Sequence, residues 1–156
     1  MKKFFFLLLA LPLVLVSCNK DDDDSQFSGE NDREIILQYL ADNNITAVET
    51  ETGTFIETRE EGTGNMPSAN SQVEVRYKGS YITDGVVFDE SPGNTTRTFS
   101  LLSVIAGFRD GLRNMRVGGK STLYIPSRLG YGANPSSSSI RRGAILVFEV
   151  ELVGIL

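Results

Sequence analysis

Residues that could carry out acid–base or nucleophilic chemistry are scarce in this sequence. It contains no histidine and a single cysteine, Cys18, although histidine is the usual group that exchanges protons near neutral pH. No G-x-S-x-G nucleophile motif occurs, and a Ser–Lys pair remains open without any pattern that marks one. One cysteine without histidine also excludes Cys/His metal sites and an internal disulfide. We therefore expect neither a metal nor a cofactor.

Two short motifs carry polar residues that could act on a ligand. Asp89 directly follows Phe88 in a short apolar stretch, and its carboxylate must be hydrogen-bonded if it is buried. Residues 118–121 (G-G-K-S) imitate the end of a phosphate-binding loop, but Asn114 stands where that motif needs its first glycine. The required order of strand before and helix after is also reversed. We interpret the two glycines as a helix stop and Lys120 as an exposed strand residue.

Strands with one buried face are the elements that must position these residues. Val73, Val75 and Tyr77 alternate with charged neighbours, a spacing that predicts a strand. Further strands are expected at 86–88, 98–101, 121–125 (alternating, ended by Pro126) and 145–153. A turn is predicted at 83–85 and a Gly/Ser-rich loop at 127–143.

Two helices are predicted as well. One carries an apolar stripe made by Val104, Ile105, Phe108, Leu112 and Met115. The other lies within residues 31–46, where Asn31 or Asp32 can cap it and an apolar face recurs at Ile35, Ile36, Tyr39 and Leu40. The polar residues 42–44 (D-N-N) are expected to stop this helix. This N-terminal helix packs either on the domain or on a second copy of the chain. The pattern predicts an α+β fold, an antiparallel sheet wrapped around one short helix, with an extra N-terminal helix.

The N-terminus has the layout of a secretory signal. Lys2 and Lys3 precede an apolar run over residues 4–16, which is shorter than the roughly 20 residues that a membrane-spanning helix needs. Residues 1–17 are therefore predicted to be a signal peptide, and the junction before Cys18 resembles the lipobox of bacterial lipoproteins, in which that cysteine is acylated. An ordinary signal peptide with an incidental cysteine is the alternative.

The acidic residues gather directly after this segment. Residues 18–49 hold two basic and nine acidic residues, whereas residues 50–156 hold eleven of each. We expect residues 18–30 to be a disordered acidic tether. Its four aspartates, Asp21 to Asp24, resemble the tags that send some lipoproteins of Gram-negative bacteria to the cell surface, and a plain solvated spacer is equally open. The neutral domain offers no electrostatic footprint for nucleic acid, so no such partner is expected.

Five segments resemble the FKBP family of peptidyl-prolyl cis/trans isomerases. They are residues 75–79 (V-R-Y-K-G), 84–89 (D-G-V-V-F-D), 104–108 (V-I-A-G-F), 130–132 (G-Y-G) and 146–152 (L-V-F-E-V-E-L). Together they cover the region from about Thr50 to Leu156, and they occur in the family's order. The resemblance implies a curved antiparallel sheet that clasps one short helix, in a domain over residues 50–156.

The resemblance also implies an apolar pocket between helix and sheet. Its lining would consist of Tyr77, Phe88, Asp89, Val104, Ile105, Phe108, Tyr131, Ile140 and Phe148. Most of these side chains have spacings that are more often those of core residues, and for Phe148 and Val104 the core and the pocket wall are equally open. By analogy with the family, Phe88, Phe108 and Phe148 would hold a prolyl ring. The Ile105 N–H and the Tyr131 hydroxyl would bind substrate carbonyls. Asp89, hydrogen-bonded to Tyr77 or to a ligand, would polarise the site.

Two departures from the family pattern affect the expected site. The pocket floor, often tryptophan, is Phe108, and Arg97 replaces an aromatic residue of one wall. The resemblance implies an isomerase that assists folding of exported proteins, with proline-containing polypeptides and macrolide immunosuppressants as ligands. Its location would be the outer membrane, on the periplasmic or cell-surface side, through the lipid on Cys18. The alternatives are a peptide-binding chaperone module that uses the same pocket without catalysis, and a lipoprotein whose N-terminal helix organises partners.

Overall fold

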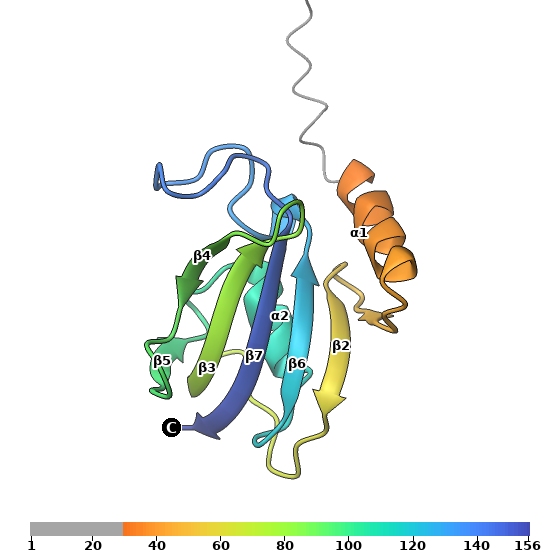
Figure 1. Cartoon of the computed structure of the whole chain (residues 1–156). Helices are drawn as coiled ribbons and strands as arrows, with labels where there is room; N and C mark the ends of the chain where they lie inside the picture. The colour runs from red at the N-terminus through yellow and green to blue at the C-terminus, as the bar shows by residue number, and fades with distance from the viewer. Residues whose placement is uncertain (1–29) are drawn as a thin grey trace, which may run out of the picture.

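The structure is a computed structural model that describes residues 30–156 (Figure 1). The predicted signal segment, Cys18 and all but the last residue of the predicted tether lie outside the described residues. That last residue, Glu30, begins a helix. Within residues 30–156, no helix combines the length and the apolar character needed to cross a membrane.

The described part of the chain forms one sheet and two α-helices. The elements in chain order are α1 (Glu30–Asp42), β1 (Val48–Glu49), β2 (Phe55–Glu60), β3 (Gln72–Tyr81), β4 (Val87–Glu90), β5 (Arg97–Ser100), α2 (Ala106–Arg113), β6 (Lys120–Ile125), the 3-10 turn η2 (Ser127–Leu129) and β7 (Leu146–Ile155). All strand pairs are antiparallel, in the order β1-β2-β6-β7-β3-β4, with β5 also paired to β3. This arrangement confirms the predicted fold class, including the extra N-terminal helix.

The main core lies between the sheet and α2, which passes behind β6 and β7 in Figure 1. Along β3 the side chains alternate as predicted, so that Val73, Val75 and Tyr77 are buried while their neighbours are partly exposed. Helix α2 approaches β6 closely at Gly111, where an added Cβ would lie 2.4 Å from Leu123 Cδ1. A larger residue at this position would push the helix off the sheet.

Helix α1 covers the other face of the sheet, beside β2 and β6 (Figure 1). Its buried residues Ile36 and Leu40 pack in a second cluster with Phe55 and Tyr124. The helix therefore docks on its own domain, one of the two arrangements that the sequence left open. Ile35, which we placed on the apolar face, is 42% exposed instead.

The C-terminal end of α1 agrees with the predicted stop at residues 42–44, although the segment assigned to the helix ran on to residue 46. The helix ends at Asp42, and Asn44 takes a left-handed conformation with φ of 53°. Two bonds close this end, from the N–H of Asn44 to the Ala41 carbonyl at 3.1 Å and from the N–H of Ile45 to the Leu40 carbonyl at 2.8 Å. At the start, Asn31 and Asp32 lie inside the first turn and do not precede it.

Two further predictions about the core were wrong in detail. Strand β6 does not alternate, since Ser121 to Ile125 are all buried. The reason is that α2 covers one face of this strand, whereas on the other face Tyr124 packs in the α1 cluster and Thr122 accepts a hydrogen bond from Arg59 Nε at 3.1 Å. Val104 and Ile105 do not belong to the stripe of α2, because the helix begins at Ala106 and Ile105 is extended with ψ of 148°.

Candidate functional site

An apolar pocket of about 190 Å³ opens between α2 and the inner face of the sheet. Its lining residues come from four strands, the start of α2 and the loop after η2. They are Tyr77, Asp89, Phe99, Ser103, Val104, Ile105, Phe108, Tyr131 and Phe148. Seven of the nine residues predicted from the sequence are therefore brought together here.

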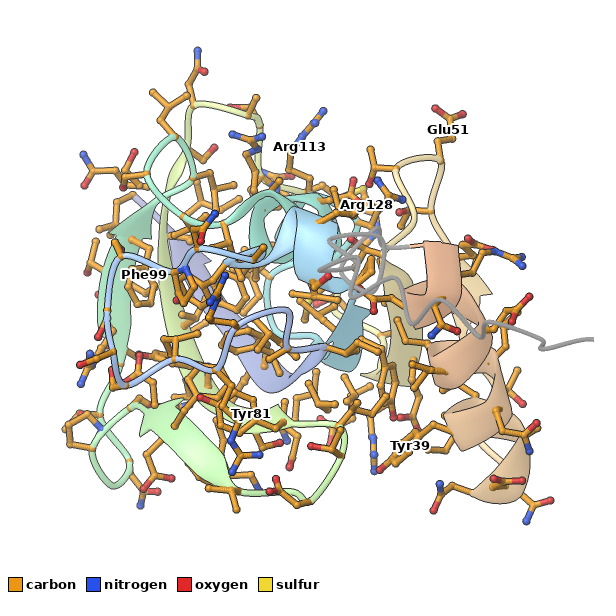
Figure 2. The ribbon with its side chains drawn as sticks, turned by 90° about the horizontal axis from the view of Figure 1, so that it is seen from above. Tyr39, Glu51, Tyr81, Phe99, Arg113 and Arg128 are labelled. Atoms are coloured by element: carbon orange, nitrogen blue, oxygen red, sulfur yellow. The ribbon has the colours of Figure 1, made fainter. Side chains whose placement is uncertain are left out.

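Aromatic rings form the floor and walls of this pocket. The rings of Phe108 and Phe148 lie with centroids 4.9 Å apart, and the Tyr77 ring meets Phe108 edge-on at 6.1 Å. Phe99 of β5 closes one side, 6.2 Å from Phe108, and Figure 2 shows it at the end of the molecule opposite α1. Tilted and edge-to-face pairs of this kind are the favoured geometries for aromatic side chains. They keep the floor rigid while leaving its surface apolar.

A polar group stands at the rim of this aromatic floor. The hydroxyl of Tyr77 donates to Asp89 Oδ2 at 2.6 Å, the bond that the resemblance implied for these two residues. Arg97 approaches the other carboxylate oxygen of Asp89 at 3.8 Å, and its guanidinium lies 5.9 Å from the centre of the Tyr77 ring. Burial, together with the bond to Asp89, raises the pKa of Tyr77 well above its usual range. The Asp89 side chain is 48% exposed, so water still reaches the carboxylate.

Two hydrogen-bond donors face the same pocket. Ile105 directly precedes α2, and within residues 30–156 its N–H has no hydrogen-bond acceptor. The N–H groups at the start of a helix are left free by the helix itself and carry its positive dipole end. Tyr131 lies across the pocket and is 37% exposed. Burial first, and then the negative charge of Asp89, raise the pKa of Tyr131, so its hydroxyl keeps its proton as a donor.

Phe88 and Ile140 do not line the pocket, contrary to the prediction. The pairing of β4 with β3 shifts register between Gly79 and Ser80, which leaves Phe88 as the extra residue of a bulge. Its ring packs against the main core cluster, edge-on to Phe148 at 5.5 Å and 5.0 Å from the ring of Tyr81. Gly79 makes room for both rings, since an added Cβ there would lie 2.7 Å from Phe148 and 2.8 Å from Phe88. Ile140 lies half-buried in the loop before β7 and is not among the lining residues.

The loop that carries Tyr131 and Ile140 is fastened to the turn between β3 and β4. The buried hydroxyl of Tyr81 donates to the Ser139 carbonyl at 3.2 Å and accepts from the N–H of Arg141 at 3.2 Å. The Arg141 guanidinium lies 4.2 Å from the centre of the Tyr81 ring and also pairs with Asp84 at 2.6 Å. This pair lowers the pKa of Asp84. The loop is thus held by stacking, hydrogen bonds and charge together.

Sequence reasoning missed two lining residues, Phe99 and Ser103. The sequence predicted a strand at 98–101 but not the direction of the Phe99 side chain, which depends on the pairing of β5 with β3 that places Phe99 opposite the buried Val73. Residues two apart share a face of a strand, so Arg97 points inward with Phe99. That position explains how a surface arginine reaches Tyr77 and Asp89. Ser103 lies in an irregular segment for which no periodicity exists.

Comparison with known families agrees with this geometry. The sequence model described as "FKBP-type peptidyl-prolyl cis-trans isomerase" matches residues 63–153, which is more than half of the chain. The chain therefore belongs to the FKBP-type peptidyl-prolyl cis-trans isomerase family.

Individual relatives are similar over much of the chain. It is 37% identical over 146 residues to the FKBP-type peptidyl-prolyl cis-trans isomerase FkpA of Aeromonas hydrophila, covering 92% of this chain and 51% of that protein. It is 40% identical over 108 residues to the FKBP-type 22 kDa peptidyl-prolyl cis-trans isomerase of Escherichia coli, covering 69% and 52%. The chain thus spans about half the length of these curated relatives.

Solved structures share the fold. The peptidyl-prolyl cis-trans isomerase of Pseudomonas syringae pv. tomato superposes with a TM-score of 0.69 at 36% identity, over 81% of this chain and 94% of that one. FkpA of Escherichia coli superposes with a TM-score of 0.71 at 34% identity, over 87% and 61%.

Proposed function

We propose that this protein catalyses the cis/trans isomerisation of X-Pro peptide bonds in the aromatic pocket, without a covalent intermediate. The observation that carries the proposal is the convergence of Tyr77, Asp89, Phe108, Tyr131 and Phe148 on one cavity of about 190 Å³. Membership of the isomerase family supports the same activity.

The chemistry of the bond fits what the pocket offers. Rotation about a peptide bond has a barrier of about 18–20 kcal/mol because the twisted amide loses resonance. The planar amide is the more polar form and is better solvated by water, so a dry apolar site disfavours it relative to the twisted form. The rings of Phe108 and Phe148 offer such a site to the proline side chain. No proton transfer is required, in keeping with a sequence that lacks histidine.

The polar groups at the rim would then orient the peptide. The Ile105 N–H, which has no acceptor among residues 30–156, and the Tyr131 hydroxyl are donors for carbonyl groups on either side of the proline. Asp89 is held by Tyr77, and its negative charge faces the pocket. A carbonyl fixed at one end leaves rotation of the proline bond as the remaining free motion, which is a positioning effect.

The clients in this proposal are exported polypeptides that contain proline. Proline isomerisation takes tens of seconds without a catalyst and limits their folding. Cys18 would carry a lipid that holds the protein at the outer membrane, on the periplasmic or the cell-surface side. Globomycin-sensitive processing together with protease accessibility on whole cells tests this location. A chain whose processing ignores globomycin would contradict the anchor.

The activity is tested with a protease-coupled assay on an X-Pro tetrapeptide, using the full chain purified in detergent. We expect acceleration over buffer, a large loss in Phe99→Ala, and no loss in the control Leu102→Ala, whose side chain is 65% exposed. A wild-type chain that matches buffer would refute catalysis.

One observation favours a second candidate, a peptide-binding chaperone module. Arg97 extends over the Tyr77 ring and engages Asp89, so one wall of the pocket is charged. Such a site could hold a peptide without promoting rotation. This candidate predicts saturable binding of a proline peptide in calorimetric titration, with no acceleration in the coupled assay.

A further inference from the structure

Helix α1 carries a buried carboxylate that takes no part in the pocket. Asp32 is 6% exposed, and its Oδ2 accepts hydrogen bonds from the N–H of Ser127 at 2.7 Å and from the Ser127 hydroxyl at 2.5 Å. Within residues 30–156, no lysine or arginine pairs with it. A buried carboxylate is costly unless it is hydrogen-bonded. The two hydrogen bonds from Ser127 therefore offset the cost of burying the Asp32 carboxylate.

Ser127 stands at the start of the segment that carries Tyr131. It begins η2, and it is 1% exposed. Its carbonyl accepts from the N–H of Gly130 at 3.0 Å and from the N–H of Gly132 at 2.9 Å. Gly132 has a left-handed φ of 64°, which a side chain would strain. The residues on both sides of Tyr131 are thus bound to the residue that Asp32 holds.

The apolar docking of α1 is carried by other residues. Ile36 and Leu40 follow Asp32 at intervals of four, so all three lie on the same face of the helix. The two apolar residues cover β2 and β6, and Asp32 is the member of the stripe nearest the loop. In Figure 2 the 3-10 turn beside Arg128 lies next to α1, consistent with the contact between Asp32 and Ser127.

We propose that α1 supports the pocket, with Asp32 as a positioning residue that holds Tyr131 through Ser127. This inference rests on the proposed function, in which Tyr131 binds the substrate. It assigns α1 a role in the activity of the domain, in addition to its role in covering the sheet.

The test is a double-mutant cycle in the full chain between Asp32→Ala and Tyr131→Phe, with kcat/KM for an X-Pro peptide as the readout. We expect Asp32→Ala to lower kcat/KM about fivefold, and less than about twofold when Tyr131 is already phenylalanine, because residues that act through one another are non-additive. Asp42→Ala is the matched control, an exposed aspartate on the same helix. Losses that multiply in the double variant would overturn the proposal.

A second readout does not depend on activity. Amide hydrogen exchange at Gly130 and Gly132 should be faster in Asp32→Ala and unchanged in Asp42→Ala. Unchanged exchange at the two glycines would also overturn the proposal. A wild-type chain without isomerase activity refutes the proposed function, whereas exchange still reports on the link itself. Ser127→Ala keeps the N–H donor and provides the same test with a smaller change if Asp32→Ala does not fold.

Discussion

The hydrogen bond between Tyr77 and Asp89 gives the sharpest prediction about the pocket. Tyr77→Phe removes only the hydroxyl, since the ring keeps its contacts with Phe99, Phe108 and Phe148. A hydrogen bond to a charged group contributes about 1.5–3 kcal/mol. Because the Asp89 side chain is 48% exposed and water can replace the tyrosine, we expect the lower end, about 1.5 kcal/mol. For a domain of this size that lowers Tm by about 6 °C.

The same variant should also lose activity. Without the Tyr77 hydroxyl, the Asp89 carboxylate keeps, among residues 30–156, only the 3.8 Å contact with Arg97, so it is less well oriented toward the pocket. We expect kcat/KM to fall about three- to tenfold, which corresponds to about 0.7–1.4 kcal/mol of transition-state stabilisation. Thermal unfolding and the protease-coupled assay measure the two effects on one preparation.

A matched control is Tyr39→Phe, the same chemical change on α1. Within residues 30–156 the Tyr39 hydroxyl makes no hydrogen bond, and its ring packs 5.9 Å from Tyr124. Figure 2 shows Tyr39 on α1, at the end of the molecule opposite Phe99. If Tyr77→Phe is as stable and as active as Tyr39→Phe, the role of the hydrogen bond is refuted. A loss of stability with unchanged kcat/KM would show a structural bond only.

Alkaline unfolding tests the pKa of Tyr77 directly. A tyrosine whose pKa is raised in the folded state keeps a proton that the unfolded chain loses near its ordinary value of 10.0. The stability is therefore complete below about pH 10 and falls as pH rises toward the folded pKa. Tyr77→Phe should make this fall shallower, by at most about 1.4 kcal/mol per pH unit. An unchanged slope would mean that the hydroxyl is not perturbed.

Two predictions concern packing. Gly111→Ala places a methyl 2.4 Å from Leu123 and should destabilise the fold by about 1–3 kcal/mol. The control Gly154→Ala, whose nearest contact is at 3.5 Å, should change stability little. Urea unfolding compares the two variants, and equal midpoints would contradict the close approach of α2 to β6. Ile36→Ala should lower the free energy of unfolding by about 2–5 kcal/mol, because Ile36 is 0% exposed. Its neighbour Ile35 is 42% exposed, so Ile35→Ala should change that free energy by no more than about 0.5 kcal/mol. Similar losses of stability in the two variants would show that α1 does not dock as described.

The sequence predicted best the strands that have one buried face and one exposed face. Strand β3 alternates between a buried and a partly exposed side, so its pattern predicted both the strand and the inward direction of Tyr77. Strand β6 does not show this alternation, because its residues are buried on both faces, on one side toward α2 and on the other toward α1. A strand buried on both sides has no period to detect, and which helix covers it depends on tertiary contacts.

The errors at the site have a different cause. The prediction placed Phe88 in the lining with Asp89, but Phe88 is the extra residue of a bulge, and its ring packs against Tyr81 and Phe148. A bulge depends on the pairing between strands that local spacing does not contain. Likewise, Asp32 looked like a cap for its own helix, since its partner Ser127 lies 95 residues further along the chain.

These long-range contacts join the two sides of the sheet into one unit around β6. Tyr124 faces α1, and its neighbours Leu123 and Ile125 face α2, so a displacement of either helix shifts the same strand. That strand ends at Pro126, and Ser127 follows as the residue held by Asp32. The pocket therefore depends on α1 even though no residue of α1 lines it. The match to the isomerase family model begins at residue 63, so both α1 and β2, which pairs with β6, precede the matched residues.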